Sequence, residues 1–513
     1  MPEISKTPSA TASSSRWFWA IFFILTVFVY FFGLSIPLVG PDEPRYAEVA
    51  REMYARGDWI TPTLGGFNWF EKPALLYWLE IAAYHIFGVN EFAARFGSAL
   101  FGLGTIASLW LVGRFASNRP YNESREFANW LALIGATTIG LIAFSRGASF
   151  DVIVTFPITA ALVSFYVYEA NETLSKQTQV LLIASFYFFI GVGLLAKGLI
   201  GAIFPLGIVG LYFAFSWHWP RRIFILSLGW GAVLCIAVAS IWYLPMYMKH
   251  STTFVSEFFI QHHFQRFISN KYQHPQPFYF YLWVLPLMTI PWLPIFGFAI
   301  WRSIKDLIGH IRLETTTEPT VEEKKERGVI RFSWAWLLVP LVFFSFSGSK
   351  LPGYILPAVP AAVLLTGAYL FNVIRERPFR QKLVKAVALA TYLTIVIALI
   401  FVVPRFVRSD TVKPLFQVSN SQGYAGLHVA GFGTVSHNAE FYAAGRLIRE
   451  EDGKQHRFNT IHEVTDYLAA SDQHQLLVLV PLEHVKQLTL NETLSTQVLD
   501  DNGELAIAVV SAK

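Results

Sequence analysis

The sequence is poor in charged residues and almost lacks cysteine. Asp, Glu, Lys and Arg make up 15% of its 513 residues, whereas an ordinary soluble domain contains about 25%. So few charges cannot coat a chain of this length with polar groups, which excludes a soluble globular protein. The formal net charge of +5 is small and does not favour a nucleic-acid-binding protein. The single cysteine, Cys235, excludes an intramolecular disulfide and a thiolate metal cage.

Hydrophobic residues are abundant instead, and they occur in long runs. They make up 54% of the chain, which includes 46 Phe, 21 Tyr and 16 Trp. Apolar runs of about 18 or more residues predict helices that cross a membrane. The sequence therefore predicts a mainly α polytopic membrane protein, a transmembrane helical bundle. About eleven spans are expected, roughly at 17–38, 91–114, 127–146, 150–170, 178–196, 198–216, 222–244, 278–301, 330–347, 351–373 and 383–403.

The distribution of Lys and Arg predicts how these helices are oriented. Short cytoplasmic loops carry an excess of both residues. If the N-terminus is cytoplasmic, the inner loops hold about twice as many as the outer loops. This favours a cytoplasmic tail, 1–16, which is rich in Ser and Thr and is predicted to be disordered. An odd number of crossings then places the C-terminus outside, and the charged stretch 303–329 becomes a solvated inner loop.

Residues 405–513 differ in composition from the membrane domain, 17–404, that precedes them. They are polar, with an amphipathic segment at 459–470 and apolar strand candidates at 475–481 and 505–511. We interpret them as a small soluble α/β domain on the outer face. Adhesion and substrate capping both remain open as roles, because no motif in this domain identifies one.

The first outer loop, 40–73, is much longer than a simple connection between helices. Its first half, from Glu43 to Ala55, has helical periodicity, and the apolar segment 74–87 predicts a juxtamembrane helix on or partly within the bilayer. Asp42 stands just beyond the first span. Its carboxylate can accept a proton from an attacking hydroxyl group, or it can simply cap the following helix.

Cationic side chains accompany this carboxylate on the outer side. Arg45 and Lys72 lie in the same loop, and Lys197 and Lys350 are predicted near the outer ends of spans. Arg and Lys bind phosphate oxygens, Arg in a bidentate manner. Together with Asp42 they favour one outward-facing site for an anionic substrate. For the loop cations individually, snorkelling toward lipid headgroups is the alternative.

Arg146 and Asp151 flank a very tight turn on the outer side. Their opposite charges predict an ion pair across this turn. The role of such a pair can be purely structural.

The second outer loop, 245–278, is rich in histidine. His262 and His263 are adjacent, so only one of them can point toward a given site. One of them, with Glu71 of the first loop and a further ligand, can bind zinc through nitrogen and oxygen atoms. The spacing matches no compact metal motif, so interfacial histidines without a metal are the alternative.

Several segments resemble a known family of membrane enzymes. Two of them resemble the first periplasmic loop of the bacterial aminoarabinose lipid A transferases: PDEPRYAEVAREMYARGDWITP and FEKPALLYWLEIAAYHIFGVNEFAARF. HHFQRF, YQHPQPFYFY and SGSKLPGYILPAVP resemble later parts of the same family. These transferases belong to the GT-C superfamily, which includes the protein O-mannosyltransferases. The resemblance covers roughly 17–375, and the family has more spans than the eleven predicted here.

The resemblance implies a multispanning glycosyltransferase of the bacterial inner membrane with its active site facing the periplasm. Such an enzyme moves a sugar from a polyprenyl-phosphate carrier to lipid A or to another envelope glycan or protein, by an inverting displacement. The implied catalytic residues are Asp42 and Asp151. The implied donor-phosphate ligands are Arg45, Lys72, Tyr354 and Lys197. The implied ligands of a divalent metal such as zinc are Glu71 and one of His262 and His263.

A transporter or flippase of an anionic lipid-linked substrate is the alternative. That class of protein is expected to bind its substrate near the bilayer midplane, between two related halves. In this sequence the charges gather at the outer boundary, and the halves show no repeat. A catalytically silent relative that binds polyprenyl phosphate is a third interpretation.

Overall fold

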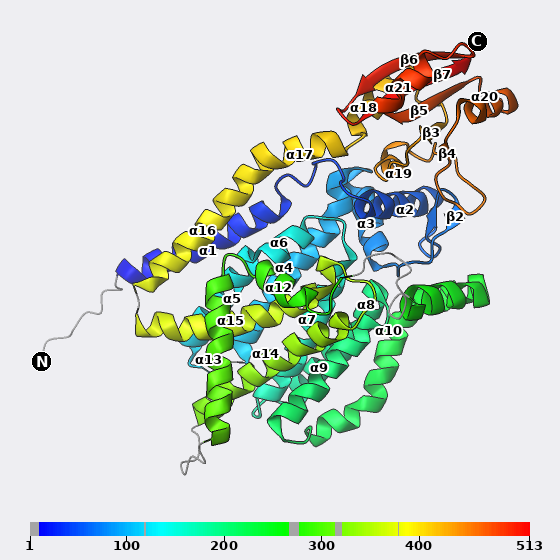
Figure 1. Ribbon diagram of the computed structural model, residues 1–513. Coiled ribbons are helices and arrows are strands. Elements are labelled where there is room, and N and C mark those ends of the chain that lie inside the picture. Colours follow the sequence, from blue (N-terminus) through cyan, green and yellow to red (C-terminus); the bar gives the residue numbers. More distant parts are fainter. Residues whose placement is uncertain (1–9, 117–118, 266–275, 313–320, 378) are drawn as a thin grey trace, which may run out of the picture.

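Long apolar helices build most of the molecule, and a small sheet domain stands at one end of them (Figure 1). The computed structural model describes residues 10–116, 119–265, 276–312, 321–377 and 379–513. The predicted tail 1–16 overlaps the first helix from Ala10 onward, and its first nine residues lie outside the described part. The C-terminus lies in the sheet domain, far from the beginning of α1 at Ala10.

The bundle is mainly α, as predicted. Its helices are α1 (Ala10–Phe31), α4 (Glu91–Phe115), α5 (Tyr121–Thr137), α6 (Ile139–Ser145), α7 (Phe150–Ala170), α8 (Lys176–Lys197), α9 (Ile200–Ser216), α10 (Arg222–Phe254), α12 (Phe280–Met288), α13 (Leu293–Arg312), α14 (Val321–Ser345), α15 (Val359–Glu376) and α16 (Arg380–Ile397). A π-helical segment, η1 (Val255–Gln265), continues α10, and a 3₁₀ segment, η2 (Pro352–Ala358), precedes α15.

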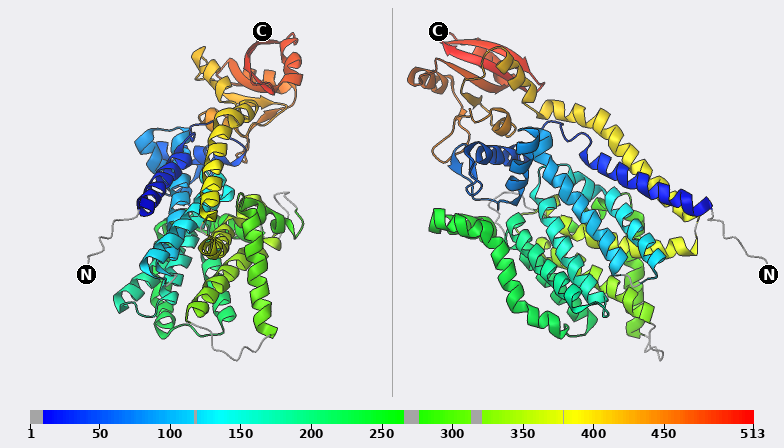
Figure 2. Two further views of the ribbon diagram at one scale, coloured as in Figure 1. Left: turned by 90° about the vertical axis from the view of Figure 1, so that its left-hand side faces the viewer. Right: turned by 180° about the vertical axis from the view of Figure 1, so that it is seen from behind.

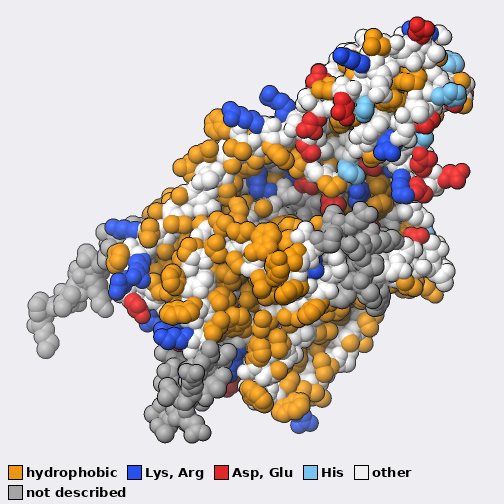
Figure 3. All heavy atoms as spheres, viewed as in Figure 1, with side chains coloured by type: hydrophobic (Ala, Val, Ile, Leu, Met, Phe, Trp, Pro, Cys, Tyr) orange, Lys and Arg blue, Asp and Glu red, His pale blue; other side chains and the backbone are white. Residues whose placement is uncertain are grey.

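On the face shown in Figure 3, hydrophobic side chains cover most of the bundle, whereas charged ones gather on the sheet domain and at the opposite end. Within the described residues, seven helices are long and apolar enough to cross a membrane, or up to nine if each bent pair counts as one span. The chain is therefore embedded in a membrane by several apolar helices. The predicted number of eleven spans is not confirmed.

Two of the predicted spans are bent. The segment 127–146 overlaps the α5–α6 pair, which is bent by 61°, and 278–301 overlaps the α12–α13 pair, which is bent by 119°. The two breaks meet, because the N–H of Ile139 donates a hydrogen bond to the carbonyl oxygen of Ile290 at 2.8 Å. Backbone groups released from one helix thus find a partner in the other break, which a membrane interior requires.

Helices also occupy much of 303–329, which the sequence predicted to be a solvated loop. α13 continues to Arg312 and α14 begins at Val321. The apolar run ends near 301, but charged residues such as Glu and Lys are good helix formers. Helical structure therefore extends past the apolar run.

The first outer loop folds into a layer between the bundle and the sheet domain. It contains α2 (Asp42–Arg56), β1 (Thr63–Leu64) and β2 (Phe67–Asn68), and α3 (Leu75–Phe87) follows in the segment 74–87. Both helices were predicted. α2 ends at Gly57, whose φ of 64° is a left-handed conformation that glycine adopts without strain.

The sheet domain is a small α/β unit. Helix α16 continues through η3 (Ala398–Val402) into α17 (Val403–Asp410), which leads to the domain (Figures 1 and 2). Its elements are α18 (Lys413–Ser421), β3 (Val429–Phe432), α19 (Ala439–Tyr442), β4 (Arg457–Phe458), α20 (Ile461–Ala470), β5 (Gln475–Pro481), η4 (Leu482–His484), α21 (Val485–Thr489), β6 (Leu494–Asp501) and β7 (Leu505–Ala512). The predicted strands and amphipathic helix correspond to β5, β7 and α20.

The five strands form one mixed sheet with the order β4-β3-β5-β7-β6. β3 is parallel to β4 and β5, and β7 is antiparallel to its two neighbours. Helices α20 and α21 pack on one face, and α18 and α19 pack on the other. α19 also contacts α2, so the domain is attached to the first outer loop.

Candidate active site

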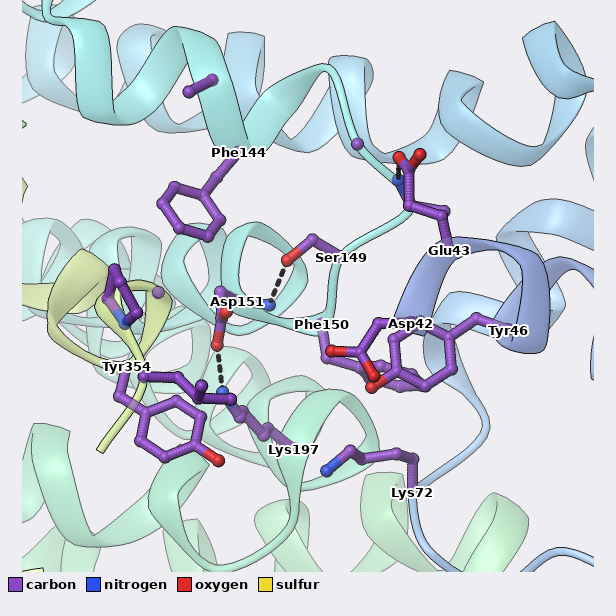
Figure 4. Close-up of a pocket in the computed structure, with 16 residues that line it drawn as sticks. Asp42, Glu43, Tyr46, Lys72, Phe144, Ser149, Phe150, Asp151, Lys197 and Tyr354 are labelled. Atoms are coloured by element: carbon purple, nitrogen blue, oxygen red, sulfur yellow. Dashed lines mark hydrogen bonds and ion pairs between the residues drawn. The ribbon is translucent and has the colours of Figure 1, made fainter. Parts of the chain in front are cut away.

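A cavity of about 360 Å³ lies where α2, the α6–α7 turn, the end of α8 and η2 meet (Figure 4). Segments far apart in the sequence supply its polar wall. The ionisable and hydroxyl-bearing residues among its lining are Asp42, Glu43, Tyr46, Lys72, Ser149, Asp151, Lys197 and Tyr354. Five of the predicted site residues are in this list: Asp42, Lys72, Asp151, Lys197 and Tyr354.

Asp42 is the first residue of α2, and about half of its side chain is exposed. Arg45 follows one helical turn later, with Nη1 3.6 Å from Oδ1 of Asp42. Its guanidinium lies over the ring of Trp69, 5.4 Å from the centroid. Arg45 thus stands beside Asp42 but is not one of the residues that line the cavity.

Asp151 and Lys197 form an ion pair on the far side of the cavity from Asp42 (Figure 4). Ser149 caps α7 by accepting a hydrogen bond from the N–H of Asp151 at 3.2 Å. The Lys197 ammonium lies 4.7 Å from the ring centroid of Tyr354. Gly353 is required here, because a Cβ atom would stand 1.9 Å from Oδ2 of Asp151. The loop before α15 can therefore approach the carboxylate closely.

The predicted ion pair between Arg146 and Asp151 is wrong. Arg146 instead donates hydrogen bonds to the carbonyl oxygens of Val29 and Phe32. Carbonyl groups at the C-terminal end of a helix lack intrahelical partners. The Arg146 guanidinium binds such carbonyl groups at the end of α1, and Asp151 forms its ion pair with Lys197 instead.

Lys72 lines the cavity, and its ammonium lies 3.1 Å from Oε1 of Glu71. Both side chains are nearly buried. The other predicted metal ligands, His262 and His263, are in η1, but their side chains lie outside the described residues. No group of three His, Cys, Asp or Glu side chains that could hold a metal ion occurs in the described part of the chain. The zinc site stays a prediction.

Lys350 does not reach the cavity. Its ammonium donates to the carbonyl oxygens of Ser347, at 2.6 Å, and of Gln276, at 3.1 Å. The side chain is largely buried. It closes the turn before η2, so its contribution is to hold the loop that carries Tyr354.

An ion pair connects the outer end of α10 to the first loop. Lys249 Nζ lies 2.7 Å from Oδ2 of Asp58. Partial burial acts to raise the pKa of Asp58, but hydrogen bonds from Lys249 and from the N–H groups of Ile60 and Thr61 outweigh it and lower the pKa to about 2. Asp58 is therefore ionised across the physiological range.

Sequence reasoning missed the pair formed by Glu43 and Arg95. Arg95 is buried in α4 and donates to Glu43 through Nη2 at 2.6 Å and Nε at 3.0 Å. It also donates to the carbonyl oxygens of Leu34, at 2.9 Å, and Pro37, at 3.1 Å. An Arg inside a predicted membrane span needs a partner, and that signal was present in the sequence at 91–114.

Comparison with known proteins supports the resemblance. The family model described as dolichyl-phosphate-mannose-protein mannosyltransferase matches residues 35–256. A protein of Pseudomonas fluorescens, named undecaprenyl phosphate-alpha-4-amino-4-deoxy-L-arabinose arabinosyl transferase 2, is 31% identical over 388 residues, which are 74% of this chain and 61% of that protein. The transferase of that name from Aeromonas hydrophila is 29% identical over 367 residues, 71% of this chain and 61% of its own length.

The chain thus matches about three fifths of the length of these relatives. The fold comparison covers more. The crystal structure of ArnT from Cupriavidus metallidurans bound to undecaprenyl phosphate superposes with a TM-score of 0.78 at 20% identity, over 98% of this chain and 98% of that one. The chain therefore has the ArnT-like fold of the GT-C superfamily and resembles both the aminoarabinose transferases and the O-mannosyltransferases.

Proposed function

We propose that the chain is a glycosyltransferase of the bacterial inner membrane that moves a sugar from a polyprenyl-phosphate carrier to an acceptor on the periplasmic side. One observation carries this proposal: two carboxylates, Asp42 and Asp151, and two ammonium groups, Lys72 and Lys197, line the same cavity. A departing polyprenyl phosphate develops negative charge, which ammonium groups stabilise. The names of the relatives support a polyprenyl-phosphate donor.

Asp42 acts on the acceptor in this proposal. Its side chain is half exposed and borders the cavity, so an acceptor hydroxyl can approach it. The carboxylate takes the proton as the acceptor oxygen bonds to the anomeric carbon. If the acceptor is a phosphate group of lipid A, that oxygen is already ionised, and Asp42 orients it instead.

The donor phosphate binds on the other side of the cavity. Figure 4 shows the Lys72 side chain extending toward the side where Lys197 and Tyr354 lie. These groups hold the phosphate while the bond between its oxygen and the anomeric carbon breaks, and the carrier leaves as polyprenyl phosphate. A single displacement inverts the anomeric centre. The resemblance implies that Arg45 binds the phosphate and that Asp151 is catalytic. Because Arg45 does not line the cavity and Asp151 pairs with Lys197, we propose that these two act by adjusting the charge of the site through their partners Asp42 and Lys197.

Glu71 and one of His262 and His263 are the proposed ligands of a divalent metal such as zinc. Oxygen and imidazole nitrogen are suitable donors for that ion. When bound, the metal would add positive charge near the donor phosphate. The acceptor is lipid A or another envelope glycan or protein.

Mass spectrometry of envelope lipids tests the proposal. Cells without the chain would be complemented with wild type, Asp42→Asn, or Asp466→Asn, a matched control in an exposed pair on α20. A sugar adduct on lipid A or another glycan is expected with wild type and control but not with Asp42→Asn. An adduct at normal level in Asp42→Asn contradicts the role of Asp42. No adduct in any strain, with all proteins expressed, favours the transporter or flippase of an anionic lipid-linked substrate.

A further inference from the structure

The sheet domain and the α17 helix that leads to it contact the backbone directly before Asp42. The N–H of Gly40 donates a hydrogen bond to Oδ2 of Asp410, at 3.2 Å, and the N–H of Leu38 donates one to the hydroxyl of Tyr442, at 2.8 Å. Asp410 ends α17 and Tyr442 ends α19. Both acceptors therefore come from a part of the chain about 370 to 400 residues away in sequence.

The backbone N–H groups of residues 38–40 depend mostly on acceptors that are distant in sequence. Three consecutive N–H groups, of Leu38, Val39 and Gly40, are all bound by side chains, and only that of Val39 has a local acceptor, Glu43 at 3.1 Å. Gly40 has a φ of 67°, so the chain turns sharply there. α2 then begins without a side-chain cap. Asp42 is the first residue after this turn, and its position depends on how the turn is held.

The two acceptors are themselves fixed. Asn438 donates to the carbonyl oxygen of Asp410 at 2.9 Å and to its Oδ2 at 3.3 Å. The Tyr442 hydroxyl donates to Oε1 of Glu91 at 3.1 Å, and that oxygen also binds Lys413 Nζ at 2.6 Å. Glu91 starts α4, so these contacts connect the sheet domain, the bundle and the turn before Asp42.

The rest of the domain interface reinforces this attachment. Arg51 of α2 donates to the carbonyl oxygen of Phe441 at 3.0 Å and lies over its ring. Arg449 packs so closely on Gly65 that a Cβ atom there would stand 1.6 Å from Nε, and its guanidinium pairs with Glu440 at 2.5 Å. Figure 1 shows α19 beside α2. The domain is thus seated on both α2 and the β1–β2 hairpin.

We infer that the sheet domain, together with the end of the α17 helix that carries it, positions the Asp42 carboxylate through Tyr442 and Asp410, and that these two are positioning residues of the reaction. The inference rests on the proposed function. This gives the sheet domain a role that its sequence did not identify, namely support of the loop that forms part of the cavity wall. A misplacement of a reacting group by about 1 Å can lower the rate by about 100-fold. Loss of either acceptor should therefore lower kcat.

The test uses the full-length purified protein with a polyprenyl-phosphate sugar donor. Asp410→Ala and Tyr442→Phe are expected to lower kcat by about tenfold or more, with the donor KM changed by less than about threefold, because Lys72, Lys197 and Tyr354 are untouched. Asp410→Asn keeps an oxygen that accepts the Gly40 N–H and should restore most of kcat. The controls are Asp466→Ala and Tyr467→Phe, which remove matching groups elsewhere in the same domain and should leave kcat unchanged.

Amide hydrogen exchange supplies a readout that does not need activity. Peptides covering 36–46 should exchange faster in Asp410→Ala and Tyr442→Phe than in wild type and the controls, while the bundle helices remain protected. Unchanged exchange in both variants overturns the inference, as does an unchanged kcat, or a loss of kcat that Asp410→Asn fails to restore. If the wild type transfers no sugar from any polyprenyl-phosphate donor, the proposed function fails, and the exchange result still decides whether the domain holds this turn.

Discussion

The Glu43 carboxylate and the Arg95 guanidinium form a buried pair that joins three parts of the chain. Besides the two hydrogen bonds from Arg95, Glu43 accepts one from the N–H of Val39 at 3.1 Å and one from the N–H of Ala148 at 2.8 Å. Ala148 belongs to the turn that leads into α7. Asp42 is next to Glu43 in sequence, and Asp151 is three residues after Ala148, so these contacts link the two sides of the cavity.

Glu43→Gln should destabilise the protein strongly. The amide is uncharged, so Arg95 would remain buried without its counter-charge, and breaking such a pair costs about 3–5 kcal/mol. Thermal unfolding of the purified protein in detergent measures the effect as a lower Tm. Asp306→Asn is the control, because Arg302 and Asp306 are both well exposed and such pairs contribute about 1 kcal/mol or less. Equal Tm values for the two variants contradict this assignment.

Removing the ammonium group of Lys197 should weaken donor binding. A hydrogen bond to a charged group is worth about 1.5–3 kcal/mol, so Lys197→Met is expected to raise the Kd for polyprenyl phosphate by at least about tenfold. Asp151→Asn should not weaken phosphate binding, since it leaves that ammonium in place and frees it from its carboxylate partner. Lys249→Met is the control, because its partner Asp58 lies away from the cavity wall.

Direct binding of polyprenyl phosphate to the purified variants separates the possibilities. The donor role of Lys197 is contradicted if Lys197→Met binds as tightly as wild type. Much weaker binding by Asp151→Asn than by wild type would contradict the expectation for that variant. It would show that the Asp151 carboxylate favours phosphate binding, by holding the Lys197 ammonium in place.

The sequence predicted the regular elements best where one physical pattern dominated. Helical periodicity predicted a helix over Glu43–Ala55, and an apolar run predicted a strand over 475–481; both are present, as α2 and β5. The bends at Thr138 and near Pro291 were not expected. Hydropathy averages over a window of residues, so it does not register a local break whose backbone groups are satisfied by another helix.

The candidate site was predicted by residue type but not by pairing. Lys197 stood out because an ionisable residue between two apolar runs is costly. The sequence predicted that Asp151 pairs with Arg146, because the two are close in sequence. In the structure Asp151 pairs with Lys197, and Arg146 donates hydrogen bonds to carbonyl oxygens at the end of α1. The Glu43–Arg95 contact spans 52 residues. Pairings of this kind depend on the packing of distant helices, which no local pattern encodes.

A divalent metal should copurify with the protein if the predicted zinc site exists. Elemental analysis of the purified wild type is expected to find about one divalent ion per chain. Glu71→Gln should reduce that content, because an amide oxygen carries no charge and is a poorer zinc ligand than a carboxylate. Glu492→Gln, at an exposed site of the sheet domain, should not. Wild-type protein free of divalent metal after purification without chelators contradicts the predicted site.

The stability of the protein should depend on pH through Glu48. Burial, opposed only in part by Arg51, raises the pKa of this carboxyl from 4.5 to about 8. Between these two values the folded chain binds a proton that the unfolded chain releases. Stability therefore falls as the pH rises through this window, by at most ~1.4 kcal/mol for each pH unit. The loss is complete only above the folded pKa.

Glu48→Gln is neutral at every pH and should remove this dependence. Between pH 4.5 and about pH 8, the Tm of Glu48→Gln is expected to fall less than that of wild type. The variant should therefore be the more stable of the two near pH 8. Glu492→Gln should follow the wild-type profile, since that carboxyl is exposed. Parallel Tm profiles for wild type and Glu48→Gln would show that the carboxyl is ionised in the fold, with Arg51 compensating its burial in full.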